Sequence, residues 1–315
     1  MKARDRRPRQ VRSSAVMPAP ADPLAGRPAP ANAWRHAAGV LDCSRGHLVG
    51  IVNATPDSFT DEGRHFGTAA SVAHGERLAA AGASVVEVGG ESLRFSERTD
   101  PEVEAERVVP VIERLARLVD VPVAVDTFKP AVAEAAIAAG AAILNDPSGL
   151  RDPEMPRIAA RGGVGVVLTH FFGIPKVRPR TFPDVDVPDA VLEWGRQALA
   201  AASEAGIPEE RIVIDPGVGL GKSPSQDLQL LHRIDEVLGL GRPVFVPISN
   251  KKVLGAVTGL EAKDRLAPTA AGVTWCRLRG ATLFRVHDVA FMRHVLEITE
   301  AMLRGEPREW HDVVK

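Results

Sequence analysis

The sequence has few cysteines, almost no net charge and no long apolar run, and each shortage excludes a class of protein. Its 315 residues contain two cysteines, Cys43 and Cys276, which are too few for a disulfide framework and lie in no metal-ligand spacing. The formal net charge of −1 gives no sign of a nucleic-acid surface. No segment approaches the length of a membrane span. We therefore expect a cytoplasmic protein with reduced thiols that binds neither nucleic acid nor a membrane.

The first 36 residues differ from the rest of the chain. They are rich in Arg, Pro and Ala and show no hydrophobic periodicity, which is the composition of a disordered tail. Their paired arginines are not followed by the continuous apolar segment of an export signal. A weak contact of this basic segment with nucleic acid is the alternative to a solvated tail. We predict a single domain over residues 37–315, since 45% hydrophobic residues suffice for one large core.

The remainder alternates between short apolar runs and longer Ala-rich segments. The runs predict strands at Leu48–Val52, Val85–Val88, Val121–Val125, Ala142–Leu144, Val164–Leu168, Ile212–Ile214, Val244–Ile248 and Thr282–Val286. Apolar residues recur every three to four positions, as in helices, at Thr68–Ala81, Val103–Leu118, Ala131–Ala139, Met155–Ala160, Val187–Ala205, Asp227–Leu238, Asp264–Leu278 and Val289–Leu303. Several helical segments end in Gly, which suits a left-handed C-cap. Eight alternations predict an α/β fold, a closed (β/α)8 TIM barrel, with an open doubly wound sheet as the alternative.

Polar side chains follow the predicted strands, as in LVGIVNATPDSF at positions 48–59. In a parallel barrel such residues meet at one rim. Asp126, Asn145 and Asp215 come from three separate strands and are joined by Lys251. A buried carboxylate is costly unless it is paired, and any one of these residues could cap a helix or pair with an interior cation. Together they favour a recognition site for a flat ligand rich in N–H and C=O groups.

The last predicted strand ends in Arg285-Val-His287, which places both side chains on the same side of the strand. Arg offers a planar fork of donors and His a second donor, so the pair suits a phosphate or diphosphate. In a closed barrel Asn53, at the end of the first strand, lies beside the eighth. It could ligate a hard cation such as Mg²⁺ that screens a diphosphate.

Seven motifs together resemble the dihydropteroate synthase family. They are, in the family's order, NATPDSF, GGESLR, VDTF, LNDPSG, IDPGVGLGK, SNKK and RVHDV. The resemblance extends from His47 to the end of the last helix. It implies a (β/α)8 pterin-binding transferase of folate biosynthesis, often a homodimer. Such an enzyme condenses 6-hydroxymethyl-7,8-dihydropterin diphosphate with p-aminobenzoate and releases diphosphate with the help of Mg²⁺.

The resemblance also implies roles for individual residues. It assigns the pterin to Asp126, Asn145, Asp215 and Lys251. It assigns the diphosphate and its metal to Asn53, Arg94, Arg285 and His287. These assignments agree with the chemistry of the strand ends, and the reaction requires positioning and charge stabilisation rather than a Ser or Cys nucleophile.

The chain departs from the family pattern around the expected p-aminobenzoate site. The family's GGESTRPG is GGESLRFS here, with Leu93 for Thr and Phe95 for Pro, and its GFGK has Leu220 for Phe. Its G-x-S-R-K reads Pro247-Ile-Ser-Asn250-Lys, so an Arg is lost. The sequence thus predicts an intact pterin and diphosphate site beside an altered acceptor site.

Two functions are consistent with this pattern. One is a dihydropteroate synthase with an altered p-aminobenzoate pocket. The other is a synthase-like paralogue that binds pterin diphosphate but uses another acceptor or has no synthase activity. A corrinoid-linked pterin methyltransferase domain has no use for the RVHD diphosphate site, and a purely structural barrel does not explain the polar rim.

Overall fold

A computed structural model of the protein describes residues 31–55, 67–92, 98–173, 175–177 and 181–305. Within these residues, eight parallel strands form one sheet in the order β8-β7-β6-β5-β4-β3-β10-β9. The strands are β3 (His47–Asn53), β4 (Val85–Gly89), β5 (Val123–Asp126), β6 (Ile143–Asp146), β7 (Gly165–Thr169), β8 (Ile212–Asp215), β9 (Phe245–Val246) and β10 (Leu283–Val286). A parallel bridge between Ile214 and Val244 joins β8 to the run that contains β9. The sheet is therefore closed, and the predicted (β/α)8 barrel is confirmed.

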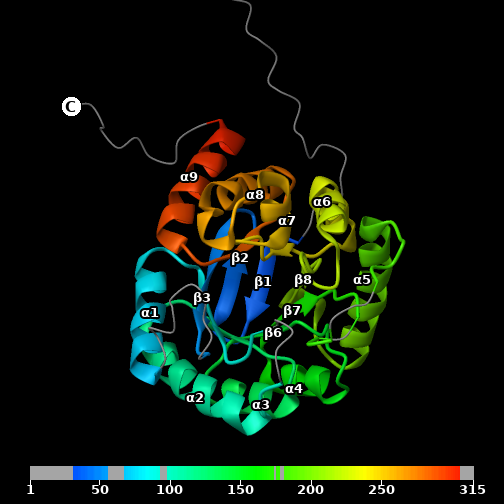
Figure 1. Ribbon diagram of the computed structural model, residues 1–315. Helices are drawn as coiled ribbons and strands as arrows, with labels where there is room; N and C mark the ends of the chain where they lie inside the picture. Colours follow the sequence, from blue (N-terminus) through cyan, green and yellow to red (C-terminus); the bar gives the residue numbers. More distant parts are fainter. Residues whose placement is uncertain (1–30, 56–66, 93–97, 174, 178–180, 306–315) are drawn as a thin grey trace, which may run out of the picture.

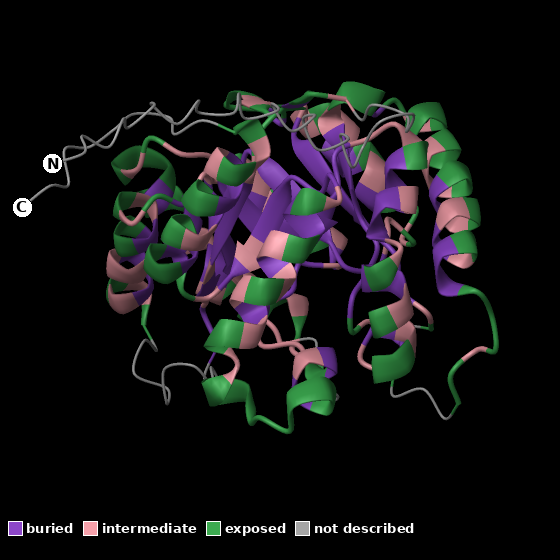
Figure 2. Cartoon of the chain, turned by 90° about the horizontal axis from the view of Figure 1, so that it is seen from above, coloured by how far each residue is buried: buried purple, intermediate pink, exposed green. Residues whose placement is uncertain are grey.

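Helices surround the strands, as the view along the barrel in Figure 1 shows. They are α1 (Thr68–Ala80), α2 (Pro101–Leu118), α3 (Pro130–Ala138), α4 (Glu154–Gly162), α5 (Val187–Glu204), α6 (Pro224–His232), α7 (Lys252–Thr258), α8 (Leu266–Leu278) and α9 (Val289–Arg304). Short 3₁₀ turns lie at Glu209–Arg211, Ile234–Leu240 and Ala262–Asp264. In Figure 2 the buried strands are enclosed by helices whose outer faces are exposed.

Local sequence explains where several helices begin and end. Proline occupies the first turn of α2, α3, α5 and α6, where its missing N–H costs no hydrogen bond. Ser223 and Gln226 form a reciprocal capping box at the start of α6. Glycine follows several helices, as the sequence predicts, and Gly82, Gly140 and Gly280 there have positive φ angles of 105°, 108° and 94°.

The strands separate two apolar layers. Outward side chains such as Val86 and Val166 pack against the helices in the larger core. Inward side chains such as Val49 and Phe245 fill the lower half of the barrel in a smaller core. Apolar residues occupy both faces of the strands at this level, so the polar network lies in their carboxyl-terminal halves.

An antiparallel hairpin, β1 (Ala33–His36) and β2 (Gly39–Asp42), closes the amino-terminal end of the barrel. The buried Trp34 belongs to the inner core, and its indole Nε1 donates to the carbonyl of Arg211 at 2.9 Å. The predicted tail over residues 1–36 therefore extends too far, because residues 33–36 are a packed strand. Residues 1–30 lie outside the described part of the chain, and a disordered tail there stays a prediction.

Other element boundaries also differ from the predictions. The strand expected at Val244–Ile248 is only two residues long, since Pro243 and Pro247 have no N–H to donate to a sheet. The helix expected at Asp227–Leu238 breaks at Arg233 into α6 and a 3₁₀ turn. The short helix α7 was not predicted. In the described residues no helix is long and apolar enough to cross a membrane.

Candidate functional site

A network of charged and amide side chains fills the upper half of the barrel, directly above the inner apolar core. The guanidinium Nη1 of Arg285 donates to Glu87 Oε1 at 2.7 Å and to Asp126 Oδ2 at 2.8 Å. The second oxygen of Glu87 accepts from Asn145 Nδ2 at 2.9 Å. Thr169 Oγ1 donates to Asn145 Oδ1 at 3.4 Å. Glu87 and Asn145 are 1% and 2% exposed, so these bonds are protected from water.

The network contains two carboxyl groups, Glu87 and Asp126, but one guanidinium, and this imbalance shifts the pKa values. Burial and the neighbouring Glu87 carboxylate raise the pKa of Asp126 to about 7, although Arg285 opposes the shift. Burial also works against the charge on Arg285, but Glu87 and Asp126 outweigh it, and the pKa of Arg285 is raised. One guanidinium thus pairs with two carboxyl groups. The remaining acceptor capacity of these groups suits a ligand with several hydrogen-bond donors.

Asp215 and Lys251 form the other part of the predicted pterin site. Burial raises the pKa of Asp215 to about 6, and Asp215 Oδ1 accepts from the Gly217 amide at 2.8 Å. Burial and the charge of Arg285 lower the pKa of Lys251 to about 8. Asp215 and Asp126 both act electrostatically on Lys251. The structure therefore brings the four predicted pterin residues together with Arg285 at one end of the barrel.

The loop after β8 is held by a buried lysine that the sequence analysis did not assign a role. Lys222 Nζ donates to the Gly217 carbonyl at 2.8 Å and to His170 Nδ1 at 2.9 Å. Burial and the charge of Lys222 lower the pKa of His170 to about 2, so the ring is neutral and Nδ1 accepts. Gly217 has φ +74°, and a Cβ there would lie 1.8 Å from the His170 carbonyl oxygen. No other residue fits at this position without moving the loop.

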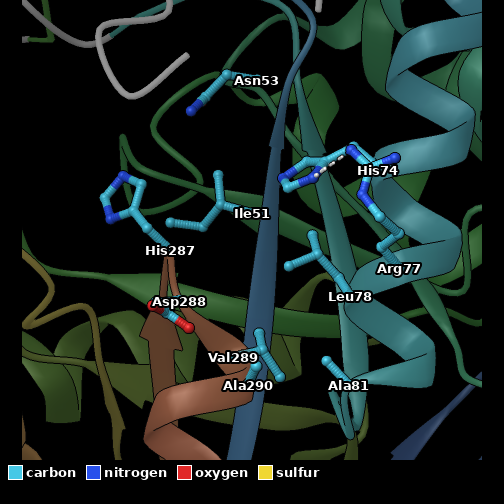
Figure 3. A pocket seen from close by; sticks show the side chains of 10 residues that line it. All are labelled: Ile51, Asn53, His74, Arg77, Leu78, Ala81, His287, Asp288, Val289 and Ala290. Carbon is cyan, nitrogen blue, oxygen red and sulfur yellow. Dashed lines mark hydrogen bonds between the residues drawn. The ribbon is translucent and has the colours of Figure 1, made fainter.

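Two residues predicted for the diphosphate and its metal, Asn53 and His287, lie at the ends of β3 and β10. His287 Nδ1 is 2.8 Å from Ser249 Oγ, which connects it to the loop after β9. Asn53 and His287 line the same cavity, and Figure 3 shows both side chains on one side of β3. In the described part of the chain no group of three or more His, Cys, Asp or Glu side chains could hold a metal ion. Asn53 itself offers an amide oxygen, which is a ligand that a hard cation such as Mg²⁺ accepts.

Arg94 lies outside the described residues, but the residues that lead to it are anchored. Lys129 Nζ lies 2.6 Å from Glu91 Oε2 and 2.5 Å from Glu104 Oε2. Lys176 Nζ lies 3.1 Å from Glu91 Oε1 and donates to the Ser92 carbonyl at 2.7 Å. The start of the loop after β4 is thus fixed by ion pairs to two other loops.

Three of the five predicted acceptor residues, Leu220, Pro247 and Asn250, are described by the structure, and all three lie outside the strands and helices. Leu93 and Phe95 are outside the described residues. Leu220 is half-buried in the loop after β8, and Pro247 is buried just after β9. Asn250 has φ +57°, a left-handed conformation that Asn tolerates better than most residues. Its amide donates to Thr269 Oγ1 at 3.2 Å and its carbonyl accepts from Arg265 Nη1 at 3.0 Å, so the backbone is fixed from both sides.

Glu87 is the main residue of the network that the sequence analysis missed. An acidic residue inside the apolar run VVEVGG is itself a signal, because a buried carboxylate requires a partner. Lys222 is the last residue of the GLGK motif, so the sequence already placed it in a Gly-rich loop without indicating its contacts. The partners of both residues depend on contacts across the barrel and between loops.

Comparisons with known proteins agree with this geometry. Residues 49–287 match the family described as "Pterin binding enzyme". The dihydropteroate synthase of Escherichia coli K12 is 34% identical over 273 residues, which cover 86% of this chain and 97% of that protein. The "Inactive dihydropteroate synthase 2" of Mycobacterium tuberculosis H37Rv is 39% identical over 269 residues, which cover 84% and 85%.

The fold also matches a solved structure. Xanthomonas albilineans dihydropteroate synthase with 4-aminobenzoic acid has a TM-score of 0.78 and 42% identity, over 84% of this chain and 95% of that one. The family match over residues 49–287 spans the strands that carry the polar network. The chain therefore belongs to the dihydropteroate synthase family of pterin-binding enzymes.

Proposed function

We propose that this protein is a dihydropteroate synthase that joins 6-hydroxymethyl-7,8-dihydropterin diphosphate to p-aminobenzoate and releases diphosphate. The observation that carries the proposal is the bonded set of Asp126, Glu87, Asn145 and Arg285 at the strand ends. These side chains, with Asp215 and Lys251, offer carboxylates to the amino side of a pterin and cations to its carbonyl. The reaction itself is inferred from membership of the dihydropteroate synthase family.

The reaction breaks the C–O bond between the pterin methylene and the diphosphate, and the electron pair leaves with the diphosphate oxygen. The amine of p-aminobenzoate forms the new C–N bond and loses one proton. Asp126 and Asp215 stabilise the positive charge that develops on the pterin. Lys251, whose pKa is about 8, is protonated at neutral pH and donates to the ring.

The leaving diphosphate is assigned to Arg94, Arg285 and His287, with Asn53 as the protein ligand of Mg²⁺. Mg²⁺ bound there would screen the charge of the diphosphate. Arg285 also contacts Asp126, which we have placed in the pterin site. This contact supports a role for the Arg285 guanidinium in both the pterin site and the diphosphate site.

The loss of the Arg at position 250 favours a second candidate, a paralogue that binds pterin diphosphate without making dihydropteroate. A relative of this chain, from M. tuberculosis, carries the name "Inactive dihydropteroate synthase 2", so a paralogue of this kind exists in the family. A product assay separates the two. Purified protein, Mg²⁺, pterin diphosphate and p-aminobenzoate should yield dihydropteroate, and Arg285→Met should yield none. Absence of product from wild-type protein that binds the pterin would establish the paralogue.

The cytoplasmic location and the homodimer stay predictions. Sedimentation of the purified chain tests the second.

A further inference from the structure

The loop after β8, residues 216–222, contacts two charged groups of the proposed pterin site. The Gly217 amide donates to Asp215 Oδ1 at 2.8 Å. Two residues further along, a Cβ on Gly219 would lie 3.2 Å from Lys251 Cδ and 3.4 Å from Lys251 Nζ, so the loop backbone packs directly against that side chain. The conformation of this loop therefore affects both Asp215 and Lys251.

Lys222 fixes the turn in the middle of the loop. The Leu220 amide closes the turn by donating to the Gly217 carbonyl at 3.0 Å. Lys222 Nζ donates to the same carbonyl at 2.8 Å and to the Leu220 carbonyl at 3.4 Å. Its contact with His170 Nδ1 at 2.9 Å joins the turn to the end of β7, the neighbour of β8 in the barrel (Figure 1). These three acceptors use all three N–H donors of an ammonium, so Lys222 acts on the site through the loop.

The surroundings of Lys222 shield these contacts and bring acidic groups close to its charge. The residue is 5% exposed, so water does not compete for its bonds. Burial lowers the pKa of Lys222 to about 7, and the carboxyl groups of Asp227 and Asp215 oppose the shift. Asp227 Oδ1 also accepts from the Gly219 amide at 2.7 Å, which holds the same loop from α6. The loop is therefore fixed from both ends by buried charged side chains.

We propose that Lys222 is a positioning residue of the pterin site. By holding the turn between Gly217 and Leu220, it fixes the backbone that binds Asp215 and packs against Lys251. The spacing of the two groups assigned to the pterin thus depends on a side chain that does not contact the ring. The proposal rests on the proposed function, because it takes Asp215 and Lys251 as pterin contacts.

Calorimetry with a pterin and, separately, with Mg²⁺-diphosphate tests this role in Lys222→Ala. The titrations are run at a pH below the Lys222 pKa of about 7, where its amine is charged. Pterin affinity should fall about tenfold because the turn loses charge-assisted bonds, whereas diphosphate affinity should not change. Lys263→Ala is the matched control, since Lys263 and its ion-pair partner Glu261 are both exposed. The control should bind both ligands as the wild type does.

Propylammonium distinguishes positioning from a general loss of structure. It replaces the atoms that Lys222→Ala removes beyond Cβ, so it can restore the bonds to the turn. Its addition should return the pterin affinity of the variant towards the wild-type value. Tetramethylammonium is the control cation, because it carries the same charge without an N–H donor, and it should restore nothing.

His170→Phe tests the same contact from β7. The Phe ring keeps the edge-on packing of His170 against Phe172 and Trp194, whose ring centroids lie 4.5 Å and 5.1 Å away, but it removes the acceptor for Lys222. Pterin affinity should fall about three- to tenfold. If Lys222→Ala does not fold, this variant decides the matter, and unchanged pterin affinity in it overturns the proposal.

A loss of pterin affinity in Lys222→Ala that spares diphosphate and is reversed by propylammonium supports the positioning role. Wild-type pterin affinity, an equal loss for diphosphate, or a loss that propylammonium does not reverse overturns it. A wild-type protein that binds no pterin contradicts the proposed function instead.

Discussion

The two sides of the barrel mouth, one predicted to bind the pterin and the other the acceptor, differ in the elements that carry them, although Lys251 of the pterin side directly follows Asn250 of the acceptor side. On the pterin side, Asp126, Asn145 and Asp215 belong to strands, and most of their contacts are with other strand residues. On the acceptor side, Leu220 and Asn250 belong to loops after β8 and β9. A strand residue is fixed by its ladder, so a substitution there disturbs the whole network. Loops tolerate change, and the described departures from the family pattern, at Leu220, Pro247 and Asn250, lie in such segments.

The largest effect should come from breaking the pterin side at Arg285. Arg285→Met leaves Glu87 and Asp126 buried without their cation, which should lower the free energy of unfolding by about 3–5 kcal/mol. Urea denaturation measures this loss. Glu87→Gln added to Arg285→Met should restore part of the stability, since it removes one of the stranded charges. Arg196→Met is the control, because the ion pair of Arg196 with Glu193 is exposed.

Arg285→Met should also abolish the rise in melting temperature that Mg²⁺-diphosphate produces in the wild type, where the midpoint should increase with ligand concentration. A wild type indifferent to diphosphate would remove Arg285 and His287 from the anion site.

Asp215→Asn should weaken pterin binding by about 1.5–3 kcal/mol, because the lost hydrogen bond is charge-assisted and buried. The same variant should make the unliganded protein more stable at pH 7, by about 1–2 kcal/mol. The folded pKa of Asp215, about 6, lies above its ordinary 3.8, so ionisation costs stability as pH rises from 4 to 6. The gain should therefore vanish below about pH 4. Unchanged pterin affinity would exclude Asp215 from the site.

Asn250→Arg tests the acceptor side. A guanidinium should strengthen p-aminobenzoate binding by ten- to a hundredfold, about 1.5–3 kcal/mol, through charge-assisted bonds to the carboxylate. It should also cost about 1 kcal/mol of stability, because position 250 has a left-handed backbone. Asn250→Lys supplies the charge without the planar fork, and Asn250→Gly keeps the backbone without a side chain. If the Arg variant binds the acceptor no better than the Gly variant, position 250 does not contact it. A variant that combines Asn250→Arg with Leu93→Thr and Phe95→Pro tests whether the other altered positions also weaken p-aminobenzoate binding.

The smallest effect should be the pH dependence of pterin affinity. Asp126, Asp215 and Lys251 titrate near pH 7, 6 and 8, so affinity should rise as the two carboxyl groups ionise and fall again as Lys251 loses its proton above pH 8. Below pH 6 protonation of Asp215 should weaken binding, by at most tenfold per pH unit. The Asp215→Asn variant should lose the part of this acid limb near pH 6, while it retains the part near pH 7 that comes from Asp126 and the decline above pH 8. A wild-type profile that stays flat down to pH 5 would contradict the assigned role.

The sequence predicts the barrel because alternating strands and helices are a local pattern, legible in runs such as Val85–Val88. It also predicts which side chains reach the rim, since a polar residue after an apolar run marks a strand end. It does not predict that Arg285 binds Glu87, 198 residues away, because that contact depends on strand register across the barrel. The hairpin at 33–42 was missed because its strands are four residues long and adjoin a Pro-rich segment.

Calorimetric titration of the wild-type protein with two ligands tests the contrast between the two sides most directly. The E. coli enzyme serves as the reference, with a pterin diphosphate analogue and p-aminobenzoate as ligands. We predict pterin affinity close to that of the reference and p-aminobenzoate affinity ten- to a hundredfold weaker, about 1.5–3 kcal/mol. Equal affinity for p-aminobenzoate would show that the altered loops do not matter. Absence of pterin binding would contradict the account as a whole.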